Sequence, residues 1–469
     1  MAVQVKRSVP GLRPNCLSFP EVFAQAIGHI SPAGIAAVGI PTVFASTGNG
    51  TWLAFVIATI GLVLIGFNIN QFARRSVSTG LLYTAVARNL GSTAGILTGW
   101  GLVAAYLFNG VAIAAGFVMY TNVLLQEFGV QLPPILLFGI CIGIVWYCAY
   151  TDVQLSSIVT LALEGISMIL IVCLAIAVLL KHGFTLDIAQ FSLQGVSPEN
   201  LRLGLVLAVF SYVGFETPTI FGYEAKRPFR LVPRAVIWSV VLPGLLYILL
   251  SYTEILGFRN YATPLDKTDV PLDALANLTG LGLLGIAISA GILCSFLSGV
   301  LVATNAGARV LYAMSRHHIM PWSLGKAHPK NETPHVAVTL FIILLFVITT
   351  VMSLFGVSVL DIYISTSTFS TYGFLMTYLL VSISAPMELR RNGNLQQRDV
   401  IIAVLAVLFV LIPVIGSLYP VPPFPYNILP YLFVAYLVAG WWFFARGKAR
   451  SPELAADMKL LTADMKRGF

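Results

Sequence analysis

Long apolar runs recur along almost the whole chain, and they constrain its fold more than any other feature. A helix needs about 20 predominantly apolar residues to cross a bilayer. Twelve stretches meet that criterion: residues 19–46, 52–73, 94–125, 133–150, 153–180, 202–224, 234–257, 279–313, 335–355, 360–384, 399–418 and 427–445. We therefore predict an all-α polytopic membrane protein with twelve transmembrane helices, embedded in a lipid bilayer.

The composition supports a membrane protein and excludes several other classes. Of the 469 residues, 58% are hydrophobic and 10% charged, whereas soluble proteins carry about 25% charged residues. The net charge of +8 does not indicate a nucleic-acid partner, because the basic residues lie between the apolar runs. The five cysteines are scattered and form no disulfide or metal-binding pattern, so we expect neither a metal nor a cofactor.

The distribution of basic residues predicts the topology. If the N-terminus is cytoplasmic, all but four of the 27 Lys and Arg residues lie on the cytoplasmic side; the exceptions are Lys181, Arg202, Arg259 and Lys267. The positive-inside rule therefore favours cytoplasmic termini and an even number of spans. We expect a protein of the cell (inner or plasma) membrane with cytoplasmic tails at residues 1–18 and 446–469.

The sixth apolar run is interrupted in its middle by polar and helix-breaking residues. These residues are Ser211, Tyr212, Gly214, Glu216, Thr217 and Pro218. A carboxylate at membrane depth costs several kcal/mol unless it faces a partner or a cavity. A broken helix also frees backbone groups, which hydrocarbon tolerates only where they line a protected site. The pattern indicates a binding site; a kinked structural helix with Glu216 bonded to a hydroxyl is the alternative.

The first run has a similar interruption, in the segment AIGHISPAGIAAVGIP around Pro32. Runs 1 and 6 lie five spans apart, as in transporters built from two inverted repeats whose broken first helices meet at the bilayer midplane. We therefore predict repeats at residues 19–180 and 202–384, followed by two further helices at 399–445. His29, beside the first break, could sense pH or line the cavity, or could be a packed neutral histidine.

Polar residues inside other runs are further candidates. Glu164 lies in the fifth run without a Lys or Arg in the same run, so it could relay protons or could be a neutral structural residue. Ser295 and Ser298 in the eighth run could line an ion site or cavity, or allow close helix packing. Glu254 is expected at the membrane interface, and Arg309 is expected to reach the cytoplasmic surface.

Three stretches resemble a known family. The first contains Tyr212-Val-Gly-Phe-Glu216, Glu224, Pro228, Arg230, Pro233 and Arg234. The second contains Gly80-Leu-Leu-Tyr83, Leu90-Gly91 and Gly99-Trp100. The third contains Ala308-Arg309-Val-Leu-Tyr-Ala-Met314, Pro321 and Pro334. In these motifs the chain is similar to the amino acid-polyamine-organocation (APC) transporter superfamily, and in particular to its amino acid permeases.

The resemblance implies a LeuT-like, five-plus-five inverted-repeat transporter that works by alternating access. It implies that backbone N–H groups of the first break bind the substrate carboxylate, and that carbonyls of the second break meet the amine. The implied substrate-binding positions are Ser31, Pro32, Ala33, Gly34, Phe210, Ser211, Tyr212, Val213 and Gly214. Phe210 and Tyr212 take gate positions. Glu216 matches the family's buried Glu, and Glu164 falls where some members carry a protonatable Lys.

The two intramembrane acids, Glu164 and Glu216, favour proton coupling, so we expect an amino acid or related amine to enter with H+. Exchange without net proton movement is the alternative. A channel would need polar residues continuous through the membrane, whereas here they concentrate in the middle of runs 1 and 6. A membrane-embedded enzyme would need a nucleophile with a base or a metal cluster, and the sequence shows neither pattern. No cation lies mid-span, which disfavours acidic substrates and leaves neutral or cationic ones. Nothing in the sequence indicates an oligomeric state.

Overall fold

A computed structural model describes residues 11–450 except 127, 260, 269, 420, 422 and 423. Most of the predicted C-terminal tail and residues 1–10 of the predicted N-terminal tail lie outside the described residues. The described part consists of helices and connecting turns and contains no strand, which confirms the all-α prediction.

The first half of the chain contains helices that match the first five predicted spans closely. They are α1 (Phe19–Ile30), α2 (Pro32–Gly34), the π-helix η1 (Ile35–Gly39), α3 (Ile40–Thr47), α4 (Thr51–Ala73), α5 (Leu81–Leu90), α6 (Ser92–Gln126), α7 (Pro134–Thr151) and α8 (Val153–Lys181), with the 3-10 turn η2 (Gly48–Gly50) between α3 and α4.

The second half continues in the same way. Its helices are α9 (Ile188–Phe191), α10 (Pro198–Phe210), α11 (Pro228–Phe258), α12 (Pro271–Leu278), α13 (Gly282–Arg316), α14 (His335–Leu354), α15 (Val359–Arg391), α16 (Gln397–Gly416) and α17 (Leu429–Arg450), and the 3-10 turns are η3 (Thr217–Thr219), η4 (Leu265–Lys267), η5 (Trp322–Gly325) and η6 (Tyr426–Ile428).

Ten stretches of the described residues are long and apolar enough to cross a membrane. The first of them, Phe19–Ala73, covers both the first and the second predicted span. The sixth predicted span is not among the ten, because α10 has only 13 residues. The count of twelve and the division into repeats therefore remain predictions.

Both predicted helix breaks are present. In the first span, Ser31 adopts a left-handed conformation (φ 51°) between α1 and α2, and Pro32 then starts the next helix, where its missing N–H costs nothing. In the sixth span, α10 ends at Phe210 and turns follow from residue 211. Beyond this break the chain forms only turns and the short η3, not the α-helix predicted to residue 224.

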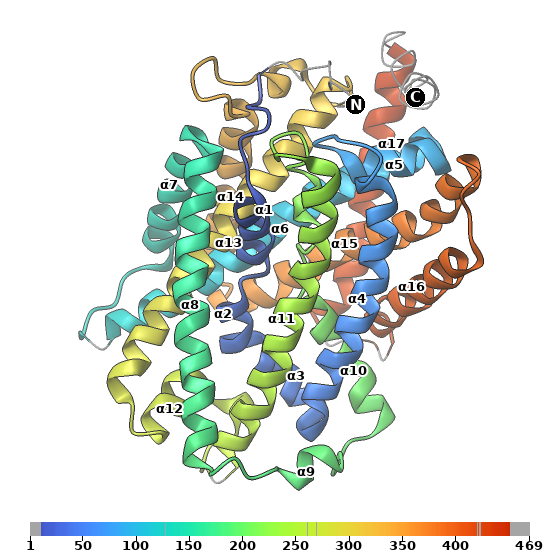
Figure 1. Cartoon of the computed structure of the whole chain (residues 1–469). Coiled ribbons are helices and arrows are strands. Elements are labelled where there is room, and N and C mark those ends of the chain that lie inside the picture. Colours follow the sequence, from blue (N-terminus) through green and yellow to red (C-terminus); the bar gives the residue numbers. More distant parts are fainter. Residues whose placement is uncertain are drawn as a thin grey trace.

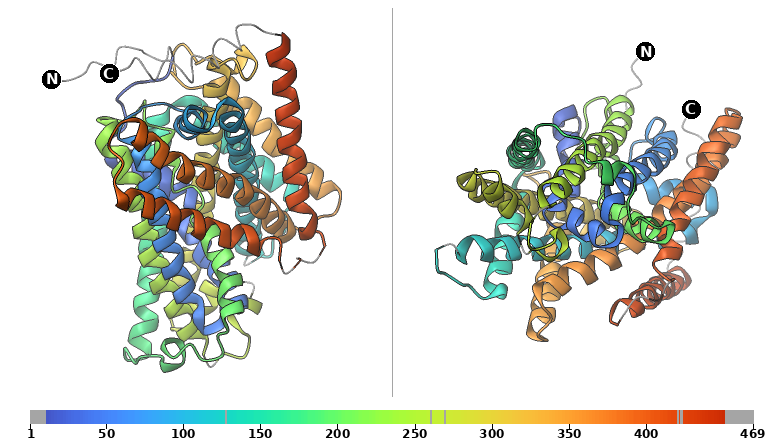
Figure 2. Two further views of the ribbon diagram at one scale, coloured as in Figure 1. Left: turned by 90° about the vertical axis from the view of Figure 1, so that its right-hand side faces the viewer. Right: turned by 90° about the horizontal axis from the view of Figure 1, so that it is seen from below.

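The broken helices stand beside α4 and α11, as the packing of α10 against α3 and α4, and of α1 against α11, shows. We call the face that carries residues 11–18 and the end of α17 the termini face, and the face that carries α9 and α12 the far face (Figure 1). In a view turned by 90°, α3, α8 and α10 reach toward the far face, while α16 and α17 lie nearer the termini face (Figure 2).

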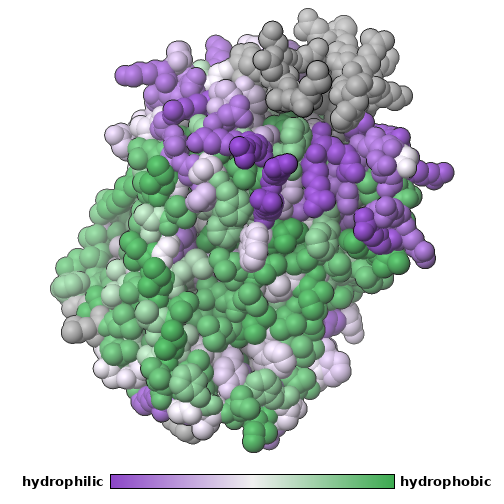
Figure 3. Space-filling view, viewed as in Figure 1, coloured by the Kyte–Doolittle hydropathy of each residue, from purple (hydrophilic) through white to green (hydrophobic). Residues whose placement is uncertain are grey.

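The surface of the molecule agrees with a membrane setting. Apolar side chains cover most of the visible flank, and hydrophilic side chains gather at the termini face (Figure 3). Inside, α6 forms the centre and packs closely on α13 and α15. Glycines permit this approach: a Cβ on Gly373 of α15 would lie 2.5 Å from the Gly101 carbonyl oxygen of α6. Small residues at such contacts are typical of membrane helix packing.

Candidate functional site

A small cavity lies between the two helix breaks. Its volume is about 20 Å³, which holds about one water molecule. The residues that line it are His29, Ile30, Ser31, Gly34, Ile35, Asn109, Ala112, Ile113, Phe210, Val213, Phe296 and Tyr363. An amino acid needs more room than this, so substrate binding would require the walls to move apart.

A chain of hydrogen-bonded side chains leads from this cavity to Glu164. The Ser31 hydroxyl lies 2.8 Å from the Ser295 hydroxyl. Ser295 donates to the two oxygens of Glu164 at 2.9 and 3.0 Å, and Ser298 donates to Oε1. Glu164 and Ser298 are fully or almost fully buried. The fold thus joins three predicted residues, from α8 and α13, to the break in the first span.

His29 connects the two breaks to α6. Its Nδ1 lies 2.8 Å from the Thr217 hydroxyl, just beyond the second break, and its Nε2 lies 2.9 Å from Asn109 Nδ2. An amide nitrogen only donates, so Nε2 accepts and the ring proton sits on Nδ1, where it can donate to Thr217. Tyr106 stacks on the ring at 5.2 Å. This arrangement fits a neutral, packed histidine.

Gly214 allows the second break to approach His29. Its backbone has a φ of +102°, and a Cβ there would lie 2.3 Å from His29 Nδ1. Both the conformation and the contact exclude a larger residue without rearrangement. A glycine at this position is therefore required by the contact between the two broken spans.

Glu216 lies at the second break but does not line the cavity. Its Oε1 accepts a hydrogen bond from Tyr106 at 2.7 Å, and its Oε2 accepts one from Tyr378 at 2.5 Å. The side chain is fully buried. The two tyrosines come from α6 and α15, so Glu216 fastens the break to both central helices.

Other predicted substrate residues are placed differently. Among the predicted positions, Ser31, Gly34, Phe210 and Val213 line the cavity, whereas Pro32, Ala33, Ser211, Tyr212 and Gly214 are not among its lining residues. The Tyr212 hydroxyl instead lies 2.8 Å from that of Thr59 on α4. Its ring packs against Phe55 and Tyr247, so it points away from the cavity.

Sequence reasoning missed the walls supplied by α6 and α13. Asn109, Ile113 and Phe296 line the cavity, and no motif marks them. Asn109 is the one polar residue of this group that stands in the middle of an apolar run, which could have drawn attention to it. The others are apolar or aromatic residues whose role depends on which helices pack together.

Between the cavity and the termini face the protein is closed. The backbone N–H of Leu17 donates to the Glu224 carbonyl at 2.8 Å, and that of Lys226 donates to the Leu17 carbonyl at 2.7 Å. Arg309 of α13 forms two hydrogen bonds of 2.7 Å to the Glu224 carboxylate and lies over the Phe221 ring. The prediction that Arg309 reaches the surface is wrong: it is 1% exposed, because Glu224 compensates its charge inside the protein.

Toward the far face, Phe210 separates the cavity from a second and larger pocket. This pocket has a volume of about 260 Å³ and is lined by Ser46, Leu203, Val206, Leu207, Phe210, Ile364, Thr368, Thr371, Tyr372, Gly416, Ser417 and Tyr426. Phe210 lines both spaces. No Asp, Glu, His, Lys or Arg is among these described lining residues.

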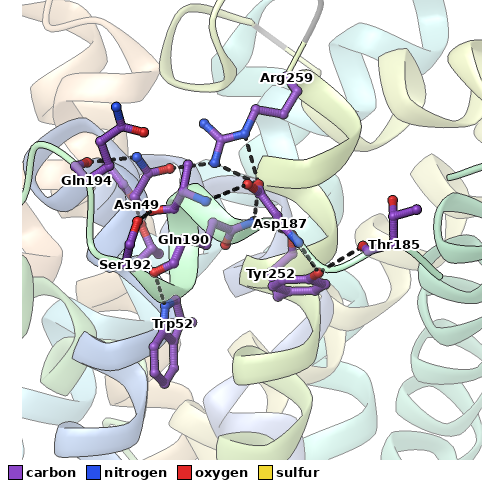
Figure 4. A network of polar contacts seen from close by, with 12 residues as sticks. Asn49, Trp52, Thr185, Asp187, Gln190, Ser192, Gln194, Tyr252 and Arg259 are labelled. Carbon is purple, nitrogen blue, oxygen red and sulfur yellow. Dashed lines mark hydrogen bonds and ion pairs between the residues drawn. The ribbon is translucent and has the colours of Figure 1, made fainter.

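A polar network joins several elements on the far face (Figure 4). Asp187, before α9, forms a 2.6 Å ion pair with Arg259 at the end of α11, and Arg259 also bonds Asn49 of η2 at 2.6 Å. Burial would raise the pKa of Asp187, but hydrogen bonds from Gln190 and Arg259 outweigh it and hold that pKa below its ordinary value. The loop before α10 is thereby tied to the α3–α4 connection and to α11.

The arrangement is that of a membrane transport protein: two broken helices enclose a buried cavity at the centre of a helical bundle. Among the described residues, no group of three or more His, Cys, Asp or Glu is placed to hold a metal. The amino acid permease family model matches residues 21–448. The chain therefore belongs to the amino acid permease family, as its motifs predicted, and it is not an enzyme.

Individual relatives are distant. A branched-chain amino acid permease, BcaP of Bacillus subtilis (strain 168), is 26% identical over 314 residues, which are 63% of this chain and 66% of the relative. Cationic amino acid transporter 4 of Mus musculus is 23% identical over 386 residues, covering 78% of this chain and 59% of the relative. The matches thus cover slightly less than two thirds of these relatives' lengths.

Solved structures support the fold. Two structures of mutants of a manganese transporter from Eremococcus coleocola align with a TM-score of 0.56 over 95% of both chains, at 13% identity. At this identity the likeness supports the fold alone.

Proposed function

We propose that this chain is a secondary active transporter that carries neutral amino acids across the membrane by alternating access, in symport with protons. The observation that carries the proposal is the side-chain path from Ser31, at the cavity, through Ser295 to the buried Glu164. It gives a protonatable group a direct effect on the place where a substrate carboxylate would bind.

The direction of the hydroxyl hydrogens along this path would couple proton binding at Glu164 to substrate binding at Ser31. When Glu164 is ionised, Ser295 and Ser298 donate to it, so the single hydroxyl hydrogen of Ser31 points to Ser295. When Glu164 is protonated it can itself donate to Ser295, and Ser295 can donate to Ser31. The Ser31 hydrogen then turns toward the cavity. A bound proton would thus add a donor for the substrate carboxylate, beside the free N–H groups of the helix that begins at Pro32.

The cavity lining favours a neutral substrate. The described residues that line it include hydroxyl, amide, imidazole and apolar groups but no carboxylate or ammonium. Glu216 is held by two tyrosines, and Glu164 lies behind two serines. A cationic side chain would find no counter-charge at the wall, whereas Ile113 and Phe296 suit an apolar one. Of the two relatives' substrate classes, branched-chain amino acids agree better with this lining than cationic ones.

Alternating access would use the two closures on either side of the cavity. Among the described residues, Phe210 is the one shared with the lining of the 260 Å³ pocket, so its rotation would open the far-face path. Release to the termini face would require separation of the segment around Leu17 from residues 223–226 and of Arg309 from Glu224. Binding of substrate and proton would shift the populations of these states.

The test is transport by the purified protein in liposomes. We would measure uptake of radiolabelled amino acids and amines with and without an inward acid gradient, for the wild type, E164Q, E216Q and S295A. Symport predicts gradient-stimulated uptake of neutral amino acids that is lost in E164Q and weakened in S295A. A Thr42→Ala variant, at an exposed position of α3, serves as the control and should transport normally.

Other outcomes would change the proposal. Uptake that requires substrate inside the liposomes and ignores the gradient would identify an exchanger. Loss of coupling in E216Q but not in E164Q would move the proton carrier to the second break. Preferential uptake of cationic amino acids would contradict the assignment of the substrate from the cavity lining.

A further inference from the structure

Glu254 on α11 is a buried acid for which no described residue provides a hydrogen bond or a counter-charge. Its side chain is 1% exposed. Both carboxyl oxygens are buried and without a hydrogen-bond partner among the described residues. The expectation of an interfacial residue is therefore wrong: Glu254 lies near the end of α11, but neighbouring helices remove it from the surface.

The other deeply buried acids are all compensated. Glu216 accepts from two tyrosines and Glu164 from two serines. Glu224 pairs with Arg309, and Glu388 pairs with Arg88. Burying an ionised carboxylate without such partners costs far more than burying the neutral acid. The neutral, protonated form is therefore the one that this environment accommodates.

A pocket on the far face is lined by a residue of α11 one helical turn from this acid. The pocket lies between α8, α11 and α12, has a volume of about 190 Å³, and is lined by Val178, Lys181, His182, Gly257, Tyr261, Leu275, Leu278 and Thr279. Its volume admits several water molecules. Gly257 follows Glu254 by three residues, so the two lie on the same side of α11, about one helical turn apart. Glu254 thus lies one turn deeper than the pocket wall.

Three other titratable groups lie in the surroundings of Glu254: Tyr120 of α6, Asp273 of α12 and Tyr363 of α15. Tyr120 in turn donates to the Ala37 carbonyl of the π-helix η1, and Tyr363 lines the substrate cavity. None of these three groups is a cation.

We propose that Glu254 is a proton-binding site, separate from Glu164 and Glu216, that exchanges its proton with water in the far-face pocket. In the closed conformation the carboxyl is protonated. When α11 moves and water reaches the group, its O–H bond breaks, the proton passes to a water molecule, and the carboxylate becomes hydrated. The use of this site in transport rests on the proposed symport, but the existence of the site does not.

The experiment is infrared difference spectroscopy of the full-length protein in liposomes, titrated with pH. We expect a carbonyl stretching band of a protonated, buried carboxyl that is present in the wild type and in the E164Q/E216Q double variant and is lost when E254Q is added to that double variant, in which Glu164 and Glu216 no longer contribute a band. E199Q is the matched control, because Glu199 carries the same group on the far face with a side chain 67% exposed. It should leave the band unchanged.

Three results would overturn the proposal: a band that persists in the E164Q/E216Q/E254Q triple variant, a band that is already lost in E164Q/E216Q, or a wild-type carboxylate signal that responds to Na⁺ rather than to pH. If E254Q does not fold, E254D keeps the acid and should show the band at a shifted position; its absence there would also overturn the proposal. Wild-type uptake that is indifferent to pH would refute the proposed symport and leave the infrared result unaffected.

Discussion

The two sides of the central cavity are closed by different kinds of contact. Toward the termini face, a fully buried ion pair and paired backbone segments join the first, sixth and eighth spans. Toward the far face, Phe210 is the one described residue that lines both the cavity and a 260 Å³ pocket. Breaking a buried ion pair is costly, whereas an aromatic side chain rotates easily. The far-face path should therefore open more readily in this conformation.

The largest expected effect comes from removing Arg309. Arg309→Met leaves Glu224 as an uncompensated buried charge, which costs about 3–5 kcal/mol of stability. The measurement is chemical denaturation in detergent. The matched control is R309M combined with E224Q, which removes both charges and should be less destabilised than R309M alone. Equal destabilisation of the two variants would show that the ion pair does not lock the termini face.

The native Cys16 reports on the same closure. The thiol is 7% exposed, and burial, followed by the nearby Glu224 carboxylate, raises the pKa of Cys16 to about 12. In R309M we expect its alkylation rate to increase by more than about tenfold, because opening of the termini face would admit the reagent and remove the burial that is the main cause of the raised pKa, which outweighs the loss of the Arg309 charge that lowers it. C16S should lose this labelling, which would show that the alkylated thiol is that of Cys16. An unchanged rate would indicate that the termini face stays closed without the ion pair.

A substitution at Gly214 tests whether the two breaks must touch. Gly214→Ala introduces a Cβ at 2.3 Å from His29 Nδ1 and a strained φ of +102°, so we expect a loss of about 1–3 kcal/mol and of substrate-induced thermal stabilisation. Gly143→Ala on α7 is the control, because a Cβ there meets no neighbouring atom within 4 Å. Normal substrate binding by the Gly214 variant would contradict a shared site between the breaks.

The far-face closure is tested by Phe210→Ala. The change joins the two spaces that Phe210 separates, so bound substrate should dissociate faster and its affinity should fall by about tenfold, or about 1.4 kcal/mol. Equilibrium binding of radiolabelled substrate to the purified protein measures this effect. Phe210→Tyr, which retains the ring, should bind nearly as the wild type does. If Phe210→Ala binds as tightly as the wild type, Phe210 is not the gate.

The smallest effect is expected in the far-face network. Because the pKa of Asp187 lies below its ordinary value, its ion pair stabilises the loop above about pH 4 and is lost as pH falls further. Asp187→Asn should destabilise the loop locally by about 1 kcal/mol and remove this acid dependence. Hydrogen exchange of residues 185–196 between pH 3 and pH 7 measures both; an unchanged acid dependence would place its origin elsewhere.

Much of the fold could be predicted because its signals are local. Apolar runs locate the helices to within a few residues, and Pro32, Pro218 and the polar residues around them locate both breaks. The sequence predicts that the sixth span stays helical to residue 224, because residues 211–224 belong to an apolar run. In the structure the backbone groups of these residues form turns, and those at its end pair with the segment around Leu17. Such long-range pairing leaves no periodicity in the sequence.

The sequence by itself determined the all-helical membrane architecture, the two breaks, the family, and the position of the acids Glu164 and Glu216 inside apolar runs. Hydrophobicity and motif residues carry that information locally. Only the tertiary structure decided what each polar group meets. It paired Arg309 with Glu224, enclosed Glu254 without a partner, joined Ser31 to Glu164 and turned Tyr212 away from the cavity. The free energy of a polar group in a membrane depends on its neighbours, and helix packing brings those neighbours from distant parts of the chain.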